Sequence, residues 1–221
     1  MTGRRKATVL ISGRGSNLQA LIDAVAAGRL ELEIIQVISN VATAAGLQRA
    51  ARAGIPTTVL EHGRFGDRAA FDRALAARIG AGEPDLVILA GFMRILGEPV
   101  LRPFEGRMIN LHPSLLPLYR GTDTYQRALD AGDSRYGASI HFVTGELDGG
   151  PVLAQVSTPV EPGDDPQSLA QRLAPLEHRL LLASVEFLTR HEVECQGKRI
   201  FIDGEALAAP LQLRADDRLT T

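Results

Sequence analysis

The sequence is poor in several residue types, and each shortage excludes a class of protein. Cys195 is the single cysteine among 221 residues, so no internal disulfide can form. Because secreted proteins usually depend on disulfides, this composition favours a reducing compartment, and we expect a cytoplasmic protein. The basic residues at positions 1–8 are followed by no apolar segment of signal-peptide length. No run of about 18 apolar residues occurs either, so we expect no membrane span.

An excess of charge of one sign is also lacking. The formal net charge is −2 and the pI is near 6.2, which gives no general attraction for nucleic acid or an anionic membrane. Tyr119, Tyr125 and Tyr136 do not form the aromatic and basic pattern of an RNA-binding surface. We therefore expect small-molecule ligands, whose anionic groups are held by local features of the fold.

The motifs of several cofactor-dependent enzymes are missing as well. The five histidines and Cys195 show neither a His-Glu-x-x-His motif nor another metal-binding spacing. Gly13 and Gly15 match the first two glycines of a dinucleotide fingerprint, but Leu18 stands where the third glycine should be. No Gly-x-Ser-x-Gly elbow of a hydrolase occurs. We expect neither a bound metal nor NAD.

The first half of the sequence alternates short apolar runs with amphipathic stretches. The predicted strands are 7–12, 32–39, 56–60, 85–90 and 106–111, and the predicted helices are 17–27, 42–53 and 67–79. This alternation predicts an α/β fold with a Rossmann-like, mostly parallel sheet and helices on both faces. Ligands of such sheets bind at the carboxyl ends of the strands. The segments at those ends are 12–17, 91–96 and 110–117.

The second half is richer in β-structure. Residues 138–143 and 152–160, joined by turn residues, predict a hairpin-like pair. Residues 166–190 have the spacing of a long amphipathic helix, in which Pro175 can introduce a kink. Residues 192–202 predict a terminal hairpin. We expect a β-rich, partly antiparallel C-terminal part within a single domain over residues 1–205, followed by a mobile tail over residues 206–221.

The segment Ser12-Gly13-Arg14-Gly15-Ser16-Asn17 lies between the first predicted strand and helix. Its glycines permit close approach of the backbone to a ligand, and the helix N-terminus offers free N–H groups, so the segment can bind phosphate. The alternative is a tight turn in which Ser16 or Asn17 caps the helix. The residues alone leave both interpretations open.

Asn110 and His112 are two positions apart at the end of a predicted strand, so their side chains point to the same face. Pro113 and Pro117 stiffen the segment that follows. An amide and an imidazole at this position can donate hydrogen bonds to a developing oxyanion. The alternative is a structural or surface histidine, which is the more common role of a lone histidine.

Leu147-Asp148-Gly149-Gly150 is first of all a turn signal, and a turn between two strands is the simpler interpretation. The functional alternative places the Asp148 carboxylate beside His112, where it would favour the protonated imidazole. The segment Gly91 to Leu96 is ambiguous too, because its apolar side chains suit either the core or a slot for a flat aromatic ligand.

Taken together, these segments resemble the folate-dependent formyltransferases. The resemblance extends from Val9 to about Ile202 and is carried by ISGRGSNLQA (11–20), AGFMRIL (90–96), NLHPSLLP (110–117), GASIHFV (137–143) and LDGG (147–150). It implies transfer of a formyl group from 10-formyltetrahydrofolate, a co-substrate, to the amine of N1-(5-phosphoribosyl)glycinamide in de novo purine biosynthesis. The loop at 15–17 and the short chain are the features that point to this ribonucleotide.

The resemblance also implies roles for individual residues. The family's catalytic trio corresponds to Asn110, His112 and Asp148. The residues implied in ribonucleotide binding are Gly15, Ser16, Asn17, Ala174, Pro175, Leu176 and Glu177, of which Glu177 would bind the amino end. The residues implied in folate binding are Arg68, Met93, Arg94, Ile95, Leu96, Asn110, Thr144, Gly145, Glu146, Leu147 and Asp148. No metal is implied.

Three positions depart from the family pattern, and none belongs to the trio. Tyr125 stands where members often have histidine, Gly145 where they often have an acidic residue, and Arg120 where some have proline or lysine. Two alternative enzymes, formyltetrahydrofolate deformylase and the core of methionyl-tRNA formyltransferase, normally carry a further domain that we do not expect in this chain. A non-catalytic nucleotide-binding module is the alternative outside the enzymes, and the intact trio argues against it. The sequence is compatible with a monomer or a homodimer.

Overall fold

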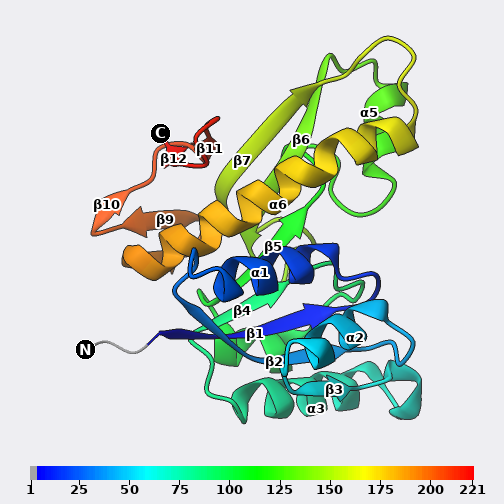
Figure 1. The fold of residues 1–221 in the computed structure, drawn as a ribbon, viewed down its shortest axis with the longest axis vertical. Helices are drawn as coiled ribbons and strands as arrows, with labels where there is room; N and C mark the ends of the chain where they lie inside the picture. The colour runs from blue at the N-terminus through cyan, green and yellow to red at the C-terminus, as the bar shows by residue number, and fades with distance from the viewer. Residues whose placement is uncertain (1–3) are drawn as a thin grey trace. The chain divides into compact units, whose positions relative to one another are not determined.

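A parallel sheet forms the centre of the first of two compact units, which together comprise the residues described by the computed structural model, 4–221 (Figure 1). The first unit extends to Asn110 and the second begins at Leu111. The strands of the parallel sheet are β1 (Arg5–Ile11), β2 (Leu32–Ser39), β3 (Thr57–Val59), β4 (Leu86–Leu89) and β5 (Met108–His112), whose last two residues belong to the second unit. Their spatial order is β5-β4-β1-β2-β3.

Burial on both faces explains why β4 and the end of β1 are nearly continuous apolar runs. All four residues of β4 are buried, as are the last five residues of β1. A parallel strand covered on both faces has this pattern, whereas a half-exposed strand alternates. The predicted mostly parallel sheet is therefore confirmed.

Four helices and two short 3-10 turns connect the strands. They are α1 (Ser16–Ala26), α2 (Ala45–Arg52), η1 (His62–Arg64), α3 (Arg68–Gly80), α4 (Glu98–Leu101) and η2 (Arg102–Phe104). The chain moves outward from β1 to β3 and then returns to β4 on the other side of β1. With right-handed crossovers, this reversal places α1 and α2 on one face and α3 and α4 on the other. Helix α1 packs against α2, and α3 against α4, so helices on both faces are confirmed.

The second unit is built on an antiparallel pair, β6 (Arg135–Phe142) and β7 (Val152–Pro159), as the sequence predicts. Helix α6 (Pro166–Arg190) packs along both strands (Figure 1). It begins with a capping box formed by Asp165 and Ser168, and it continues through Pro175. On its apolar face Leu169, Leu173, Leu180 and Val185 are buried, while Leu176 is half-buried.

The remaining elements of the second unit are short. Helix α5 (Thr124–Asp130) precedes β6, and β8 (Val193–Gln196), β9 (Arg199–Ile202) and β10 (Glu205–Ala206) form a three-stranded antiparallel sheet. Strand β11 (Leu211–Leu213) pairs in parallel with β7, and β12 (Leu219–Thr220) pairs with β11. The segment expected to be a mobile tail thus contains two paired strands. Its mobility and the predicted single domain over residues 1–205 both stay predictions.

Among residues 4–221, no helix combines the length and the apolar character that a membrane crossing requires.

Two serines of the second unit are equally buried but differ in their hydrogen bonds. The hydroxyl of Ser139 accepts from Leu116 N–H (3.0 Å) and Gln155 Nε2 (2.9 Å). It also donates to Ser114 O (2.7 Å). The hydroxyl of Ser184, on α6, has no hydrogen-bond partner among the described residues. A buried polar group left without a partner costs about 1–3 kcal/mol, so the two hydroxyls should contribute to stability with opposite sign.

Alanine substitutions test this difference. Ser139→Ala should lower the free energy of unfolding by about 1–3 kcal/mol, because it leaves the buried Leu116 N–H without its acceptor and the Gln155 amide with one acceptor, Leu116 O, instead of two. Ser184→Ala removes an unpartnered hydroxyl and adds a better helix former, so we expect the free energy of unfolding to stay unchanged or to rise by about 1 kcal/mol. Urea unfolding of both variants measures the effects. Equal losses in the two variants would contradict the assignment.

Candidate functional site

Three loops of the first unit meet at Ser12, at the carboxyl ends of β1, β2 and β4. The backbone N–H of Ser12 donates to Gly91 O (3.0 Å), and its hydroxyl donates to Asn40 Oδ1 (2.5 Å). The same hydroxyl accepts from Met93 N–H (2.7 Å). The strand order reverses between β1 and β4, and ligands of open α/β sheets bind at such a reversal. Ser12 and Asn40 therefore hold the glycine-rich loop beside the segment that contains Met93.

The glycine-rich loop leaves the N-terminus of α1 open to an anion. Gly15 is the N-cap residue of α1, so the alternative in which Ser16 or Asn17 caps the helix is wrong. Its φ is +71°, and a Cβ would lie 2.7 Å from Gly46 Cα, so only glycine fits. With a glycine cap and no acidic residue in the first turn, no side chain neutralises the positive end of the helix dipole.

The segment after β4 divides between core and surface. Phe92 and Leu96 are buried, whereas Met93 is 69% exposed and Ile95 is 55% exposed. Leu96, which the resemblance implies in folate binding, thus belongs to the core. Met93 and Ile95 are accessible, and their part in a slot for a flat ligand stays a prediction. The guanidinium of Arg94 lies 6.0 Å from the centre of the Phe71 ring.

Helix α3 supports the end of this segment through one carboxylate. Asp72 is buried, and its Oδ2 accepts a hydrogen bond from Gly97 N–H (3.0 Å). Arg68 Nε lies 3.6 Å from the same oxygen. Arg68, which the resemblance implies in folate binding, therefore has Asp72 as a neighbour and is half exposed.

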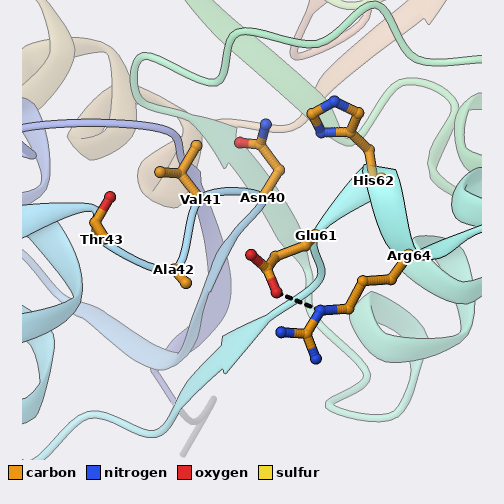
Figure 2. A pocket seen from close by; sticks show the side chains of 8 residues that line it. Asn40, Val41, Ala42, Thr43, Glu61, His62 and Arg64 are labelled. Carbon is orange, nitrogen blue, oxygen red and sulfur yellow. Dashed lines mark ion pairs between the residues drawn. The ribbon is translucent and has the colours of Figure 1, made fainter.

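A cavity of about 360 Å³ lies at the carboxyl ends of β2 and β3, where Figure 2 shows its lining. The lining residues are Asn40, Val41, Ala42, Thr43, Glu61, His62, Gly63 and Arg64. Glu61 and Arg64 form an ion pair with each other, so their charges are neutralised locally (Figure 2). None of the residues implied by the sequence lines this cavity, and we assign it no role.

In the second unit, the carboxylate of Asp148 lies between two imidazoles. Its Oδ2 is 3.5 Å from His112 Nδ1, and its Oδ1 is 3.6 Å from His141 Nε2. Gly121 N–H donates to Oδ2 (2.9 Å). The side chain of Asp148 is 11% exposed and that of His112 is 6% exposed. The structure thus brings His112 and Asp148 together, and it adds His141, which the sequence placed only within a family motif.

The other nitrogen of each imidazole faces a backbone carbonyl. His112 Nε2 is 3.0 Å from Tyr119 O, and His141 Nδ1 is 3.0 Å from Phe142 O. Because a carbonyl only accepts, these nitrogens carry hydrogen. Both nitrogens of His112 then face acceptors, an arrangement that the protonated imidazole satisfies with its two donors. Burial lowers the pKa of His141 to about 4, so this second imidazole is neutral near pH 7.

The turn at 146–149 aims Asp148 at His112. Gly149 N–H donates to Glu146 O (3.0 Å), and Asp148 has φ 44°, in the left-handed region that aspartate tolerates. A Cβ on Gly150 would lie 1.8 Å from Phe142 O, so this position requires glycine. The simpler interpretation, a turn, and the functional one, a carboxylate beside His112, are therefore compatible. Asn110, half-buried on β5, shares a strand face with His112.

Arg120 forms an ion pair with Glu146, and Lys198 Nζ lies 3.5 Å from the other oxygen of that carboxylate. Both cations hold the pKa of Glu146 below its usual range. In the implied folate-binding segment 144–148, Glu146 is therefore paired within the protein, and Leu147 is 48% exposed. Arg120 is one of the three departures from the family pattern, and here it bridges two loops of the second unit.

Glu177, on α6, is half-buried together with its neighbours Ala174 and Leu176, while Pro175 is exposed. The hydroxyl of Tyr125, on α5, donates to Glu177 Oε1 (3.4 Å). Burial raises the pKa of Glu177 to about 7, and the Tyr125 hydrogen bond opposes that shift. The sequence did not predict this contact, because it joins residues that are 52 positions apart.

Known proteins resemble this chain over most of its length. Residues 5–185 match the formyl transferase family. The chain is 43% identical over 199 residues to phosphoribosylglycinamide formyltransferase of Escherichia coli (strain K12), a match that covers 90% of this chain and 94% of that protein. It is 45% identical over 177 residues to trifunctional purine biosynthetic protein adenosine-3 of Drosophila melanogaster, where 79% of this chain matches 13% of a much longer protein.

A solved structure agrees with this relationship. The phosphoribosylglycinamide formyltransferase of Coxiella burnetii superposes with a TM-score of 0.88 at 43% identity, over 92% of this chain and 96% of that one. The part of the chain that matches the family, residues 5–185, contains strands β1 to β7 and both His112 and Asp148. The chain therefore belongs to the formyl transferase family.

Proposed function

We propose that the protein transfers a formyl group from 10-formyltetrahydrofolate to the amine of N1-(5-phosphoribosyl)glycinamide, in de novo purine biosynthesis. The observation that carries the proposal is the buried pair of His112 and Asp148, whose facing atoms are 3.5 Å apart in a chain of this family. The names of the E. coli and C. burnetii relatives support the same activity and substrate. We propose that the protein is cytoplasmic and that it acts as a monomer or a homodimer. We also propose that its reaction needs neither a metal nor NAD.

The reaction requires a stabilised oxyanion. The amine attacks the formyl carbon, a C–N bond forms, and the carbonyl oxygen becomes a tetrahedral oxyanion. Asn110 and His112 lie on one face of β5, where the Asn110 amide can donate a hydrogen bond to that oxygen. The imidazole of His112 can do the same once its Nε2 hydrogen turns from Tyr119 O to the substrate. One well-placed donor of this kind contributes about 3–4 kcal/mol to catalysis.

The reaction also requires a proton transfer. The attacking amine loses a proton, and N10 of the folate gains one when its bond to the formyl carbon breaks. Asp148 is the carboxylate beside His112, and it serves to relay this proton, directly or through water. His141 remains neutral near pH 7 because burial lowers its pKa to about 4, so it adds no second cation.

Binding is assigned by segment. The open N-terminus of α1, with Gly15, Ser16 and Asn17, suits the phosphate of the ribonucleotide, because its N–H groups and dipole favour an anion. Glu177, with the residues 174–176, is proposed to receive the amino end. Met93 and Ile95, both exposed, suit the flat folate ring, and Arg68 and residues 144–148 are proposed to contribute as well.

Asp148→Asn tests the carboxylate. Asparagine tolerates the left-handed backbone and keeps an oxygen for Gly121 N–H, so the fold should persist. Turnover should fall by about 10²–10⁴-fold, because the amide of the variant cannot take up the proton that the carboxylate relays. The measurement is absorbance of the folate product with both substrates present, and the same mixture without ribonucleotide detects any deformylase activity.

Asp216→Asn is the control for this experiment, because Asp216 is an exposed aspartate paired only weakly with Arg218. It should retain wild-type turnover. A protein with Asp148→Asn that melts at a lower temperature yet turns over normally per folded molecule would show that Asp148 is only a turn residue.

Substitution of Ser16 tests the phosphate site better than substitution of Gly15, where a side chain would collide with Gly46. Ser16 is exposed in the first turn of α1, so Ser16→Glu is compatible with the helix and even suits its dipole. The added charge should raise KM for the ribonucleotide at least about tenfold by repelling its phosphate. Ser16→Gln, of similar size but neutral, should raise it much less. If KM for folate rises instead, the loop binds the other substrate.

Removal of metal is expected to leave activity intact. Among residues 4–221, no cluster of three or more His, Cys, Asp or Glu side chains has an arrangement that could hold a metal ion. Dialysis against EDTA should therefore change turnover by less than about twofold, since the donors proposed for the oxyanion are protein groups. Activity that disappears on dialysis and returns with zinc would overturn this part of the proposal.

A further inference from the structure

Glu177 lies in a part of the second unit that offers it no cation. Among the described residues no basic side chain forms an ion pair with Glu177, and the Tyr125 hydroxyl lies 3.4 Å from its Oε1. The titratable groups near it are Tyr125 on α5, Tyr136 on β6 and His178 beside it on α6. Strands β7, β11 and β12, which also pack against α6, contain no titratable side chain. The carboxylate therefore depends on a neutral donor.

Tyr125 is itself held in a fixed position. Its ring packs on that of Tyr136, with 5.1 Å between the ring centres and 41° between the planes. The Tyr136 hydroxyl bonds to the hydroxyl of Thr124 (2.6 Å) and to the backbone oxygen of Pro113. A phenol has one hydrogen, so Tyr136 donates to Pro113 and accepts from Thr124. This chain of contacts joins the segment that follows His112 to the first turn of α5, and through Tyr125 to Glu177.

We propose that Tyr125 is a positioning residue that orients the Glu177 carboxylate and favours its ionised form for ribonucleotide binding. The inference rests on the proposed function, because it takes Glu177 as a group that binds the ribonucleotide. The Tyr125 hydroxyl donates to Oε1 and leaves Oε2 for the ligand. Burial and Glu177 raise the pKa of Tyr125 above its usual range, so this donor keeps its hydrogen.

The sign of the pH dependence follows from the surroundings of Glu177. Its pKa is about 7, so the carboxyl is protonated below that pH and ionised above it. Ribonucleotide binding through a carboxylate should then strengthen as pH rises through 7. The Tyr125 hydrogen bond lowers the pKa of Glu177, so its loss moves the ionisation to higher pH. The substrate's own amine and phosphate titrate identically with every variant, so they cancel in a ratio of two proteins.

Tyr125→Phe removes the hydroxyl and keeps the ring that packs on Tyr136. We expect Kd for the ribonucleotide, measured by calorimetry, to rise about three- to tenfold at pH 6. This ratio to wild type should approach one at pH 9, where Glu177 is ionised in both proteins. Kd for folate should not change. In a Glu177→Gln background, which cannot titrate, the ratio for Tyr125→Phe should lose its pH dependence.

A second measurement does not require any activity. Carbon NMR of glutamate labelled at the carboxyl carbon follows the ionisation of Glu177, assigned by its absence in Glu177→Gln. Its midpoint should move upward in Tyr125→Phe. An unchanged midpoint, or a Kd ratio that is the same at every pH, would overturn the inference and leave Tyr125 as a packing residue. Absence of formyl transfer by the wild type would instead contradict the proposed function. A Glu177→Gln protein that binds the ribonucleotide with the wild-type Kd would show that Glu177 does not bind this substrate, and would overturn the inference as well.

Discussion

The burial of the Asp148 carboxylate is the constraint on which much of the second unit depends. An ionised carboxylate removed from water is stable only with donors or opposite charge around it. Its polar neighbours come from separate segments: Gly121 N–H donates from the loop after β5, and His112 lies beside it on β5. The neutral ring of His141, on β6, lies on the other side without donating. Satisfying this one group therefore fixes the turn at 146–149 with respect to two other segments. The left-handed backbone of Asp148 and the glycine at 150 are the local conditions under which the carboxylate can reach them.

The loops near this carboxylate contain two charged interactions, an ion pair and a hydrogen bond, that contribute differently to stability. The ion pair of Arg120 and Glu146 is formed by partly exposed side chains, and such pairs contribute only about 0–1 kcal/mol. The hydrogen bond from Gly121 to Asp148 is better shielded from solvent and is made to an ionised group, for which about 1.5–3 kcal/mol is typical. Arg120 is adjacent to Gly121, and Glu146 is two residues from Asp148. The exposed pair thus lies beside the stronger, buried contact and adds to its geometry more than to its energy.

How far the sequence predicts this structure depends on whether a signal is local. The bounds of β2 and α6 match to the residue, because β2 is rich in β-branched residues and ends where the polar pair Ser39-Asn40 begins, and α6 starts at a proline preceded by an aspartate cap. Helix α5 was missed because it has seven residues and starts from a left-handed Asp123, and the strands at 211–220 are too short for periodicity. The catalytic trio is predicted through family motifs and stays a prediction, although the structure places His112 and Asp148 side by side. Contacts such as Ser12 with Asn40, 28 positions apart, were beyond reach, because no local pattern encodes them.

The helix caps explain why α1, and not another long helix, is suited to an anion. Among the three longest helices described, α3 and α6 each begin with an aspartate, whose carboxylate accepts from a backbone N–H of the first turn at 2.6 Å and 2.7 Å. These carboxylates occupy the position that an anionic ligand would take. Helix α1 has Gly15 instead, and the neighbouring loops are held by the neutral hydroxyl of Ser12 rather than by a charge. At the N-terminus of α2, one backbone N–H is already hydrogen-bonded within the protein, because Gly46 N–H donates to Gly13 O. The positive end of α1 is thus left available by the choice of cap, and the first unit positions its loop without any carboxylate that would compete with phosphate.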